Sequence, residues 1–145
     1  MKIREKTNVN LFIVSDSDEF IELSYVNPWD AEWDYNKIIG ANGGYMILLP
    51  KNKTYSHDFY QCKEITAYVE KIDEINERVY VSQIHWLYMR NIIENRLHLP
   101  VKIIKRYPGK LTVAQIVMPG QEINKTAIKA LAEEMQEKIY IKQFV

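Results

Sequence analysis

The stretch from Cys62 to Gln83, CKEITAYVEKIDEINERVYVSQ, constrains the fold more than any other part of the chain. Apolar residues alternate with polar or aromatic ones in ITAYVE and again in RVYVS, on either side of the charged segment DEINE. Alternation with a period of two places one set of side chains toward a core and the other toward solvent. Because DEINE lacks the Asn-Gly or Asp-Gly pair of a two-residue turn, we expect an antiparallel hairpin with a longer loop. Lys71 and Ile72 interrupt the alternation, which predicts a bulge or a strand end at that point.

Length and composition predict a small cytoplasmic protein. The 145 residues suffice for one domain or two very small ones, and the apolar fraction of 47% is enough for a core. A single cysteine excludes an internal disulfide, which fits a reducing compartment. No apolar run approaches the roughly 18 residues of a membrane span. The first residues also lack the apolar region and cleavage site of a signal peptide.

Charge divides the chain into two unlike halves although the net charge is zero. Residues 1–85 hold nine Lys/Arg and fourteen Asp/Glu, a net charge of −5, and residues 86–145 hold ten and five, a net charge of +5. Such asymmetry predicts either two surfaces with different partners or two halves that attract each other.

Three strands are expected before the hairpin, at residues 8–14, 21–26 and 45–50. The segment WDAEWDY lies between the second and the third. On a helix, Trp29 and Trp33 would share one face and the carboxylates the other. This pattern fits a short helix that closes the end of a barrel or sheet, and it also fits a partner-binding surface formed by Trp29, Trp33 and Tyr35.

Two segments that resemble ligand sites flank the third strand, a glycine cluster before it and a lysine-containing segment after it. GANGG lacks the Lys-Ser/Thr and the G-x-G-x-x-G spacing of phosphate loops, so it is interpreted as a turn or bulge before the strand. The following segment, KNKTYSHDFYQ, mixes Lys51, Lys53 and Tyr55 with further rings. That mixture suits stacking on unpaired bases, and it suits equally an ordinary loop with its rings under the core.

After the hairpin the apolar period changes to that of a helix, in SQIHWLYMRNIIENRLHL, with Ser82 as the expected N-cap and Pro100 beyond its end. A second hairpin is predicted over residues 101–118, then a helix capped by Asn124 and a closing strand over residues 139–145. Cations and one ring gather near the Pro-Gly turn of this hairpin: Lys102, Lys105, Arg106, Tyr107 and Lys110. They form either a solvated tip or a tip that contacts phosphates.

The first hairpin and the strand before it resemble the S-one type RNA-binding domain. The matching residues are ITAYVEKID, RVYVS, Gly43-Gly44-Tyr45, Ile47 and Pro50. This resemblance implies an OB-fold barrel that binds RNA. The second half is similar in element order to a type II KH domain, and LAEEMQEKIYIKQF looks like the last helix and strand of that domain. PGQEINKT stands where the KH family has its GxxG loop, and it contains one glycine.

These observations predict an α+β protein. We expect a small OB-like antiparallel barrel or sheet over residues 1–85 and a KH-like αββαβ half over residues 86–145, either as two domains or packed as one compact unit. The expected function is non-enzymatic binding of RNA or single-stranded DNA through Lys51, Lys53, Tyr55, Lys102, Lys105, Arg106, Tyr107 and Lys110. The alternative is a protein-binding module or inhibitor from a phage or mobile element, which would use the acidic aromatic surface.

No enzyme, metal or cofactor signature is present in the sequence. Nucleophile elbows and phosphate loops are absent, so no catalytic residue and no cofactor is predicted. Asp16 and Asp18 begin like a calcium loop, but Ile21 stands where that loop needs glycine. One cysteine and three scattered histidines give no metal-ligand spacing.

Overall fold

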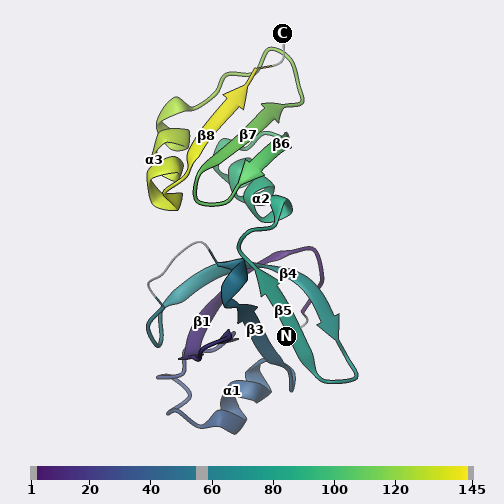
Figure 1. The fold of residues 1–145 in the computed structure, drawn as a ribbon, viewed down its shortest axis with the longest axis vertical. Coiled ribbons are helices and arrows are strands. Elements are labelled where there is room, and N and C mark those ends of the chain that lie inside the picture. The colour runs from purple at the N-terminus through teal and green to yellow at the C-terminus, as the bar shows by residue number, and fades with distance from the viewer. Residues whose placement is uncertain (1–2, 55–58, 144–145) are drawn as a thin grey trace. The chain divides into compact units, whose positions relative to one another are not determined.

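A computed structural model describes residues 3–54 and 59–143, and the chain divides into two compact units, Met1–Gln83 and Ile84–Val145 (Figure 1). In its described residues the first unit contains five strands, a short helix and one 3-10 turn. They are β1 (Asn8–Asp16), β2 (Phe20–Ser24), α1 (Tyr35–Ala41), β3 (Met46–Pro50), η1 (Lys51–Lys53), β4 (Glu64–Asp73) and β5 (Arg78–Ser82).

The strands of the first unit close into a barrel in the order β1-β2-β3-β5-β4. β1 pairs with both β2 and β4, and all pairs are antiparallel except β3 with β5, which is parallel. A closed five-stranded barrel of this order is the OB-fold. The OB-like barrel that the sequence predicted is therefore confirmed.

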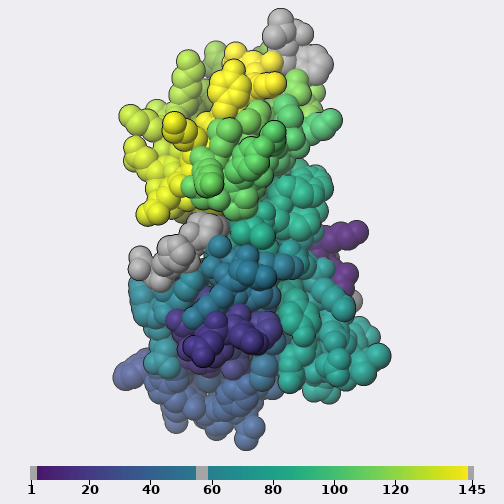
Figure 2. All heavy atoms as spheres, in the orientation of Figure 1, coloured from purple at the N-terminus to yellow at the C-terminus, as the bar shows by residue number. Residues whose placement is uncertain are grey.

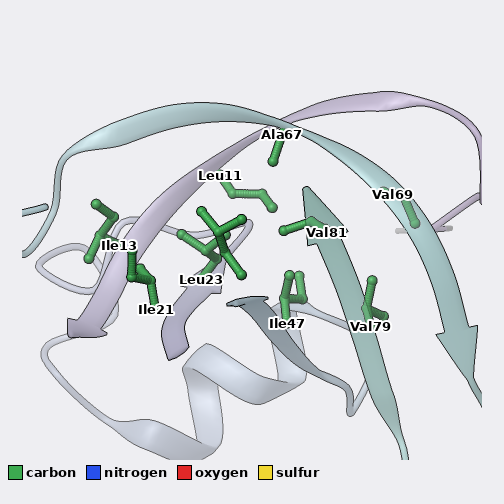
Figure 3. Packing of buried hydrophobic residues seen from close by; sticks show 10 residues of the cluster. Leu11, Ile13, Ile21, Leu23, Ile47, Ala67, Val69, Val79 and Val81 are labelled. Atoms are coloured by element: carbon green, nitrogen blue, oxygen red, sulfur yellow. The ribbon is translucent and has the colours of Figure 1, made fainter. Parts of the chain in front are cut away.

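The barrel interior explains the alternation of the sequence. Each of the five strands contributes two buried residues to one cluster, and their side chains point inward (Figure 3). Because neighbours along a strand point to opposite faces, two alternate residues per strand fill the interior of so small a barrel. The cluster consists of Leu11, Ile13, Ile21, Leu23, Ile47, Leu49, Ala67, Val69, Val79 and Val81.

The β4–β5 hairpin has the longer loop and the bulge that the sequence predicted. Its register shifts between Val69 and Lys71, where one extra residue of β4 faces β5. The loop spans residues 74–77, and the Asp73 carboxylate accepts hydrogen bonds from the backbone and side chain of Asn76. Those hydrogen bonds hold the pKa of Asp73 below its usual value.

The β2–β3 connection corrects one sequence prediction. Residues 28–33 form turns rather than a helix, and the Trp33 amide donates to the carbonyl of Pro28. Glu32 and Trp33 have φ values of 56° and 57°, which a helix cannot continue. The expectation that Trp29 and Trp33 share a helix face is therefore wrong. The helix α1, which the sequence did not predict, begins after Asp34, whose side chain accepts from the Asn36 amide as its N-cap.

The second unit has the element order helix, strand, strand, helix, strand, as predicted. Strand β7 lies between β6, its antiparallel neighbour, and β8, its parallel neighbour. His85, rather than Ser82, caps the first helix, because its Nδ1 accepts from the Leu87 amide whereas Ser82 ends β5. The elements are α2 (Trp86–Leu97), β6 (Val101–Tyr107), β7 (Leu111–Ile116), α3 (Lys125–Met135) and β8 (Lys138–Lys142).

One face of this sheet packs on the two helices. Helix α2 contacts β6 and α3, and α3 contacts β8. Buried residues of β6 and β7 meet buried residues of both helices, among them Val101, Ala114, Ile116, Met89, Ile93 and Leu131. Trp86, the first residue of α2, is 47% exposed. Within residues 3–54 and 59–143, no helix is long and apolar enough to cross a membrane.

Candidate nucleic-acid interface

The second face of the β6-β7-β8 sheet carries the cations and rings of the second unit. Registers across the sheet pair Lys102 with Gln115, Lys105 with Val113 and Tyr107 with Leu111. They also pair Leu111 with Lys138, Val113 with Tyr140 and Gln115 with Lys142. Directly opposed residues of paired strands share a face. We call this set the open face: Lys102, Lys105, Tyr107, Leu111, Val113, Gln115, Lys138, Tyr140 and Lys142.

The two faces of the sheet differ sharply in burial. On the helix side, Ala114 and Ile116 are 0% and 1% exposed. On the open face, Tyr107 and Tyr140 are 46% and 58% exposed, and the four lysines are exposed as well. In the view of Figure 2, green and yellow atoms of the three strands are visible on the surface of the second unit, together with atoms of α2 and α3. The open face is therefore accessible to a ligand.

A bulge in β6 brings the two lysines of that strand to the same face. Lys102 and Lys105 are three residues apart, so a regular strand would direct them to opposite faces. The register shifts between Ile103 and Lys105, where two residues of β6 oppose one residue of β7. Ile104 is the additional residue and is exposed. As a result, Lys105 and Tyr107 follow Lys102 on the open face.

Lys105 and Tyr107 interact directly on this face. The Lys105 Nζ atom lies 5.1 Å from the centroid of the Tyr107 ring, within the range of a cation–π contact. A hydrogen bond with Tyr107 raises the pKa of Lys105. The lysine therefore keeps its charge beside a ring that is 46% exposed.

Carboxylates of the second unit pair with arginines and leave its lysines to solvent. Arg90 pairs with Glu94, Arg96 with Glu134 and Arg106 with Glu137. Within the described part of the unit, no ion pair joins a carboxylate to any lysine. Of the nine residues of the open face, four are lysines and none is acidic. The positive charge of this unit is thus concentrated on lysines, many of them on one face.

Arg106 lies on the opposite side of β6 from its neighbours. Its side chain is 3% exposed, its Nε is 3.5 Å from the Glu137 carboxylate, which is 1% exposed, and its Nη1 donates to the His85 carbonyl. Glu137 also accepts from the Gly109 amide and the Thr112 hydroxyl, both at 2.7 Å. Arg106, a predicted nucleic-acid contact, is therefore part of an internal network that anchors the β6–β7 turn. Lys110, in that turn, is exposed.

The lysines of the first unit that were predicted to bind nucleic acid pair with carboxylates, unlike the lysines of the open face. Lys51 pairs with Asp16 at 2.5 Å, and Lys53 pairs with Glu70 at 2.6 Å. Tyr55 lies outside the described residues. The structure thus brings together Lys102, Lys105 and Tyr107, with Lys110 in the adjoining turn, but gives Lys51 and Lys53 carboxylate partners within the barrel.

The loops that OB-folds use for oligonucleotides are acidic in this chain. OB-folds bind these ligands through the face of strands 2 and 3 and through the loops after strands 1 and 4. Here those loops hold Asp18 and Glu19, and Glu74 and Glu77. Such carboxylates repel a phosphate backbone. The face of β2 also carries Glu22, whose carboxylate accepts from the Tyr35 hydroxyl of α1 at 2.6 Å.

Residues predicted to bind a protein partner lie in and beside the β2–β3 connection. Trp29 is 71% exposed and Trp33 is also exposed, both in the turns before α1. Tyr35 is held by Glu22, and partial burial, followed by this carboxylate, raises its pKa to about 12. All three side chains are therefore accessible, Tyr35 being 44% exposed, and the Tyr35 hydroxyl also links α1 to β2.

Sequence reasoning did not identify the part of the open face that β8 contributes, namely Lys138, Tyr140 and Lys142. The alternation in KIYIK indicates a strand. The sequence does not show that this strand pairs with β7 or that the two strands run parallel. Six residues of the open face come from the β6–β7 pair, which the sequence did reveal, so the missed part was the continuation of the face onto β8. Among the described residues, no cluster of three or more His, Cys, Asp or Glu side chains could hold a metal ion.

No family model matches the chain, and no curated protein matches it. Among solved structures, it is similar to a chain of the "Crystal structure of a/eIF2alpha-aDim2p-rRNA complex from Pyrococcus horikoshii OT3". The TM-score is 0.41 and the identity 10%, over 66% of this chain and 55% of that one. The OB topology of the first unit therefore rests on its own strand order rather than on this likeness.

Proposed function

We propose that the protein binds single-stranded nucleic acid on the open face of its second unit. The observation that supports this most strongly is a sheet face with four lysines, two exposed tyrosines and no carboxylate. Proteins that bind single strands combine a positive surface, which follows the backbone, with rings on which bases stack. The open face offers both on one rigid sheet.

Each residue type of the open face has a role in this proposal. Tyr107 and Tyr140 lie two strands apart, roughly 10 Å across the sheet, since neighbouring strands are about 4.8 Å apart. Each would stack on one base of the same strand. Leu111 and Val113 form an apolar floor between them, and the lysines at the margins would contact phosphates. Exposed rings on an open sheet face fit unpaired bases, which can stack on them, better than the paired bases of a duplex.

The test is binding of a fluorescently labelled single-stranded oligonucleotide, followed by anisotropy at low salt. Replacing Tyr107 or Tyr140 by alanine should weaken binding by roughly 5- to 150-fold, because one base–aromatic stack contributes about 1–3 kcal/mol. Phenylalanine at either position should preserve most of the affinity.

The chain offers a matched control for these variants. Tyr60 is exposed like the two tyrosines of the open face, but it belongs to the first unit and lies beside Lys63. Tyr60→Ala should therefore leave the affinity unchanged. Absence of binding at low salt, or equal losses in all three alanine variants, would contradict the proposal. Parallel titrations with RNA and DNA of the same sequence would show whether a 2′-hydroxyl contributes.

A second candidate function is protein binding by the β2–β3 connection. Trp29 is the most exposed tryptophan of the chain, and Asp30 and Glu32 lie beside it. Exposed tryptophans often form the centres of protein interfaces. An acidic surface around them suits a basic partner, as an inhibitor of a nucleic-acid-binding protein would require. Trp29→Ala should abolish capture of such a partner from nuclease-treated lysate and leave oligonucleotide binding unchanged.

A further inference from the structure

The outer edge of β8 lacks a partner strand among the described residues. β8 pairs with β7 on one side only, and its sequence KIYIK contains no proline, glycine or bulge. An edge of this kind presents unpaired backbone N–H and C=O groups to any extended segment that approaches it.

A groove of about 850 Å³ follows this edge. On the α3 side it is lined by Ile128, Ala132, Ile139 and Ile141. Around the edge of β8 it extends to Leu111, Val113 and Tyr140 of the open face. The two isoleucines of β8 are only half-buried, whereas their neighbours on β7 in the same register, Thr112 and Ala114, are 0% exposed. The apolar layer between α3 and the sheet is thus complete at β7 and incomplete at β8.

The charges around the groove are positive. Lys125 and Lys129 of α3 and Lys138 of β8 line it, Lys142 ends the strand, and no acidic residue contributes to the lining. Side chains of a strand added at this edge would alternate between the α3 side, which is apolar, and the side of the open face, where Lys138 and Lys142 flank Tyr140.

We infer that the edge of β8 binds an extended segment of another protein in which apolar residues alternate with acidic ones. The backbone of that segment extends the sheet, as in other complexes formed by strand addition. Its apolar side chains complete the layer against Ile128 and Ala132, and its carboxylates lie beside Lys138 and Lys142.

A second copy of this chain does not fit the same edge. Antiparallel pairing of two β8 strands centred on Tyr140 would set Lys138 directly opposite Lys142 at both ends of the pair. Parallel pairing in register would set each lysine beside its own copy. Like charges in direct opposition destabilise a strand pair, and lysines on edge strands commonly prevent self-association. The same lysines that disfavour a second copy therefore favour an acidic segment.

The experiment titrates the full chain with a synthetic peptide, Glu-Val-Glu-Val-Glu, and follows backbone amide signals by NMR. Signals of β8 and α3 should shift, and a Lys-Val-Lys-Val-Lys peptide should cause no shift. Lys138→Glu, an exposed change on β8 where the inference places a carboxylate of the segment, should weaken peptide binding about fivefold or more, as expected for an exposed ion pair replaced by repulsion. Lys110→Glu is the matched control, with the same change of charge outside the groove, and should have no effect.

Other outcomes would overturn the inference. Equal shifts with both peptides, or shifts confined to β6 and β7, would exclude a selective strand site. Concentration-dependent dimerisation that Lys142→Glu strengthens would instead indicate self-pairing of β8. Ala132→Leu, which fills the groove without a change in charge, should reduce peptide binding and leave oligonucleotide binding unchanged. This result separates the inference from the proposed function.

Discussion

At the scale of single residues, the β6–β7 hairpin separates Arg106 from the lysines around it. Arginine forms planar, multivalent hydrogen bonds and suits buried pairs, whereas lysine is a strongly hydrated point charge. Arg106 is accordingly enclosed with Glu137, while Lys102, Lys105 and Lys110 remain exposed within a few residues of it. The sequence alone treats these four cations as one cluster. Their separation depends on which face of β6 each residue occupies, and that follows from the bulge at Ile104.

Tyr35 gives a prediction that belongs to the residue scale. Its pKa in the folded protein is raised to about 12 from an ordinary value of 10.0, first by partial burial and then by the Glu22 carboxylate. A group whose pKa is raised on folding holds its proton more tightly in the folded state. Its contribution to stability is therefore complete below pH 10 and is lost as the pH rises from 10 toward 12.

The measurement compares the wild type with Tyr35→Phe, because other tyrosines also titrate in this range. In denaturant unfolding, the free energy of unfolding of the wild type should fall more steeply between pH 10 and pH 12 than that of Tyr35→Phe. Tyrosinate absorbance should show that the variant lacks one group that titrates near pH 12. Identical pH profiles of the two proteins would contradict the assigned Tyr35–Glu22 interaction.

At the scale of elements, the bulge in β6 leads to a prediction about deletion. Because Ile104 is the additional residue, its removal restores an unbroken ladder in which Lys105 still opposes Val113 and Tyr107 still opposes Leu111. The open face keeps its composition, so oligonucleotide affinity should change by no more than about twofold, within the small effects of substitutions away from contacts. Deleting Lys105 is the control. That deletion removes a cation of the face, so a larger loss of affinity is expected.

The buried network around Glu137 connects the β6–β7 turn to the start of β8. Glu137→Ala leaves Arg106 as a buried charge without its carboxylate, and the Gly109 amide and Thr112 hydroxyl lose their acceptor. Breaking a buried pair from one side costs about 3–5 kcal/mol. Hydrogen exchange of the β7 amides should accelerate accordingly. Glu133→Ala, at an exposed position of α3, should leave these exchange rates nearly unchanged.

At the scale of elements, the sequence predicted the strands and the helices of the second unit but not the helix α1. Periodicity identified all eight strands of residues 3–54 and 59–143 and both helices of the second unit, because alternation and apolar stripes are local patterns. It did not identify α1. The tryptophan spacing favoured a helix at residues 29–33, but the positive φ values of Glu32 and Trp33 end that turn, and the helix begins at Tyr35. The Asp34 cap was the local signal that could have placed α1.

The candidate site was less predictable than the fold, for a physical reason. The β6–β7 turn is a local motif, so Lys102, Lys105 and Tyr107 could be recognised together. Tyr140 joins them only because β8 pairs in parallel with β7, and a parallel partner across a helical connection leaves no local sequence signal. Likewise, nothing in the local sequence shows that Lys51 and Lys53 have carboxylate partners on β1 and β4.

At the scale of the whole molecule, the net charge of zero does not describe the local charge of the binding surface, which decides how a phosphate backbone binds. A phosphate backbone responds to the charges within about one Debye length, which is about 8 Å at physiological salt. The lysines of the open face act at that range, whereas the acidic residues of the first unit include partners of Lys51 and Lys53. A neutral protein is therefore expected to show strongly salt-dependent binding.

The final prediction concerns the slope of that salt dependence. For a single strand, the logarithm of the binding constant falls with the logarithm of salt concentration by about 0.7 for each phosphate neutralised. The four lysines of the open face should thus give a slope of about −3, and Lys102→Ala or Lys142→Ala should each reduce it by about 0.7. Lys51→Ala and Lys53→Ala should leave it unchanged, because their charges are already paired within the barrel. If these two changes lowered the slope instead, the barrel would be the nucleic-acid surface, and the open face would have another ligand.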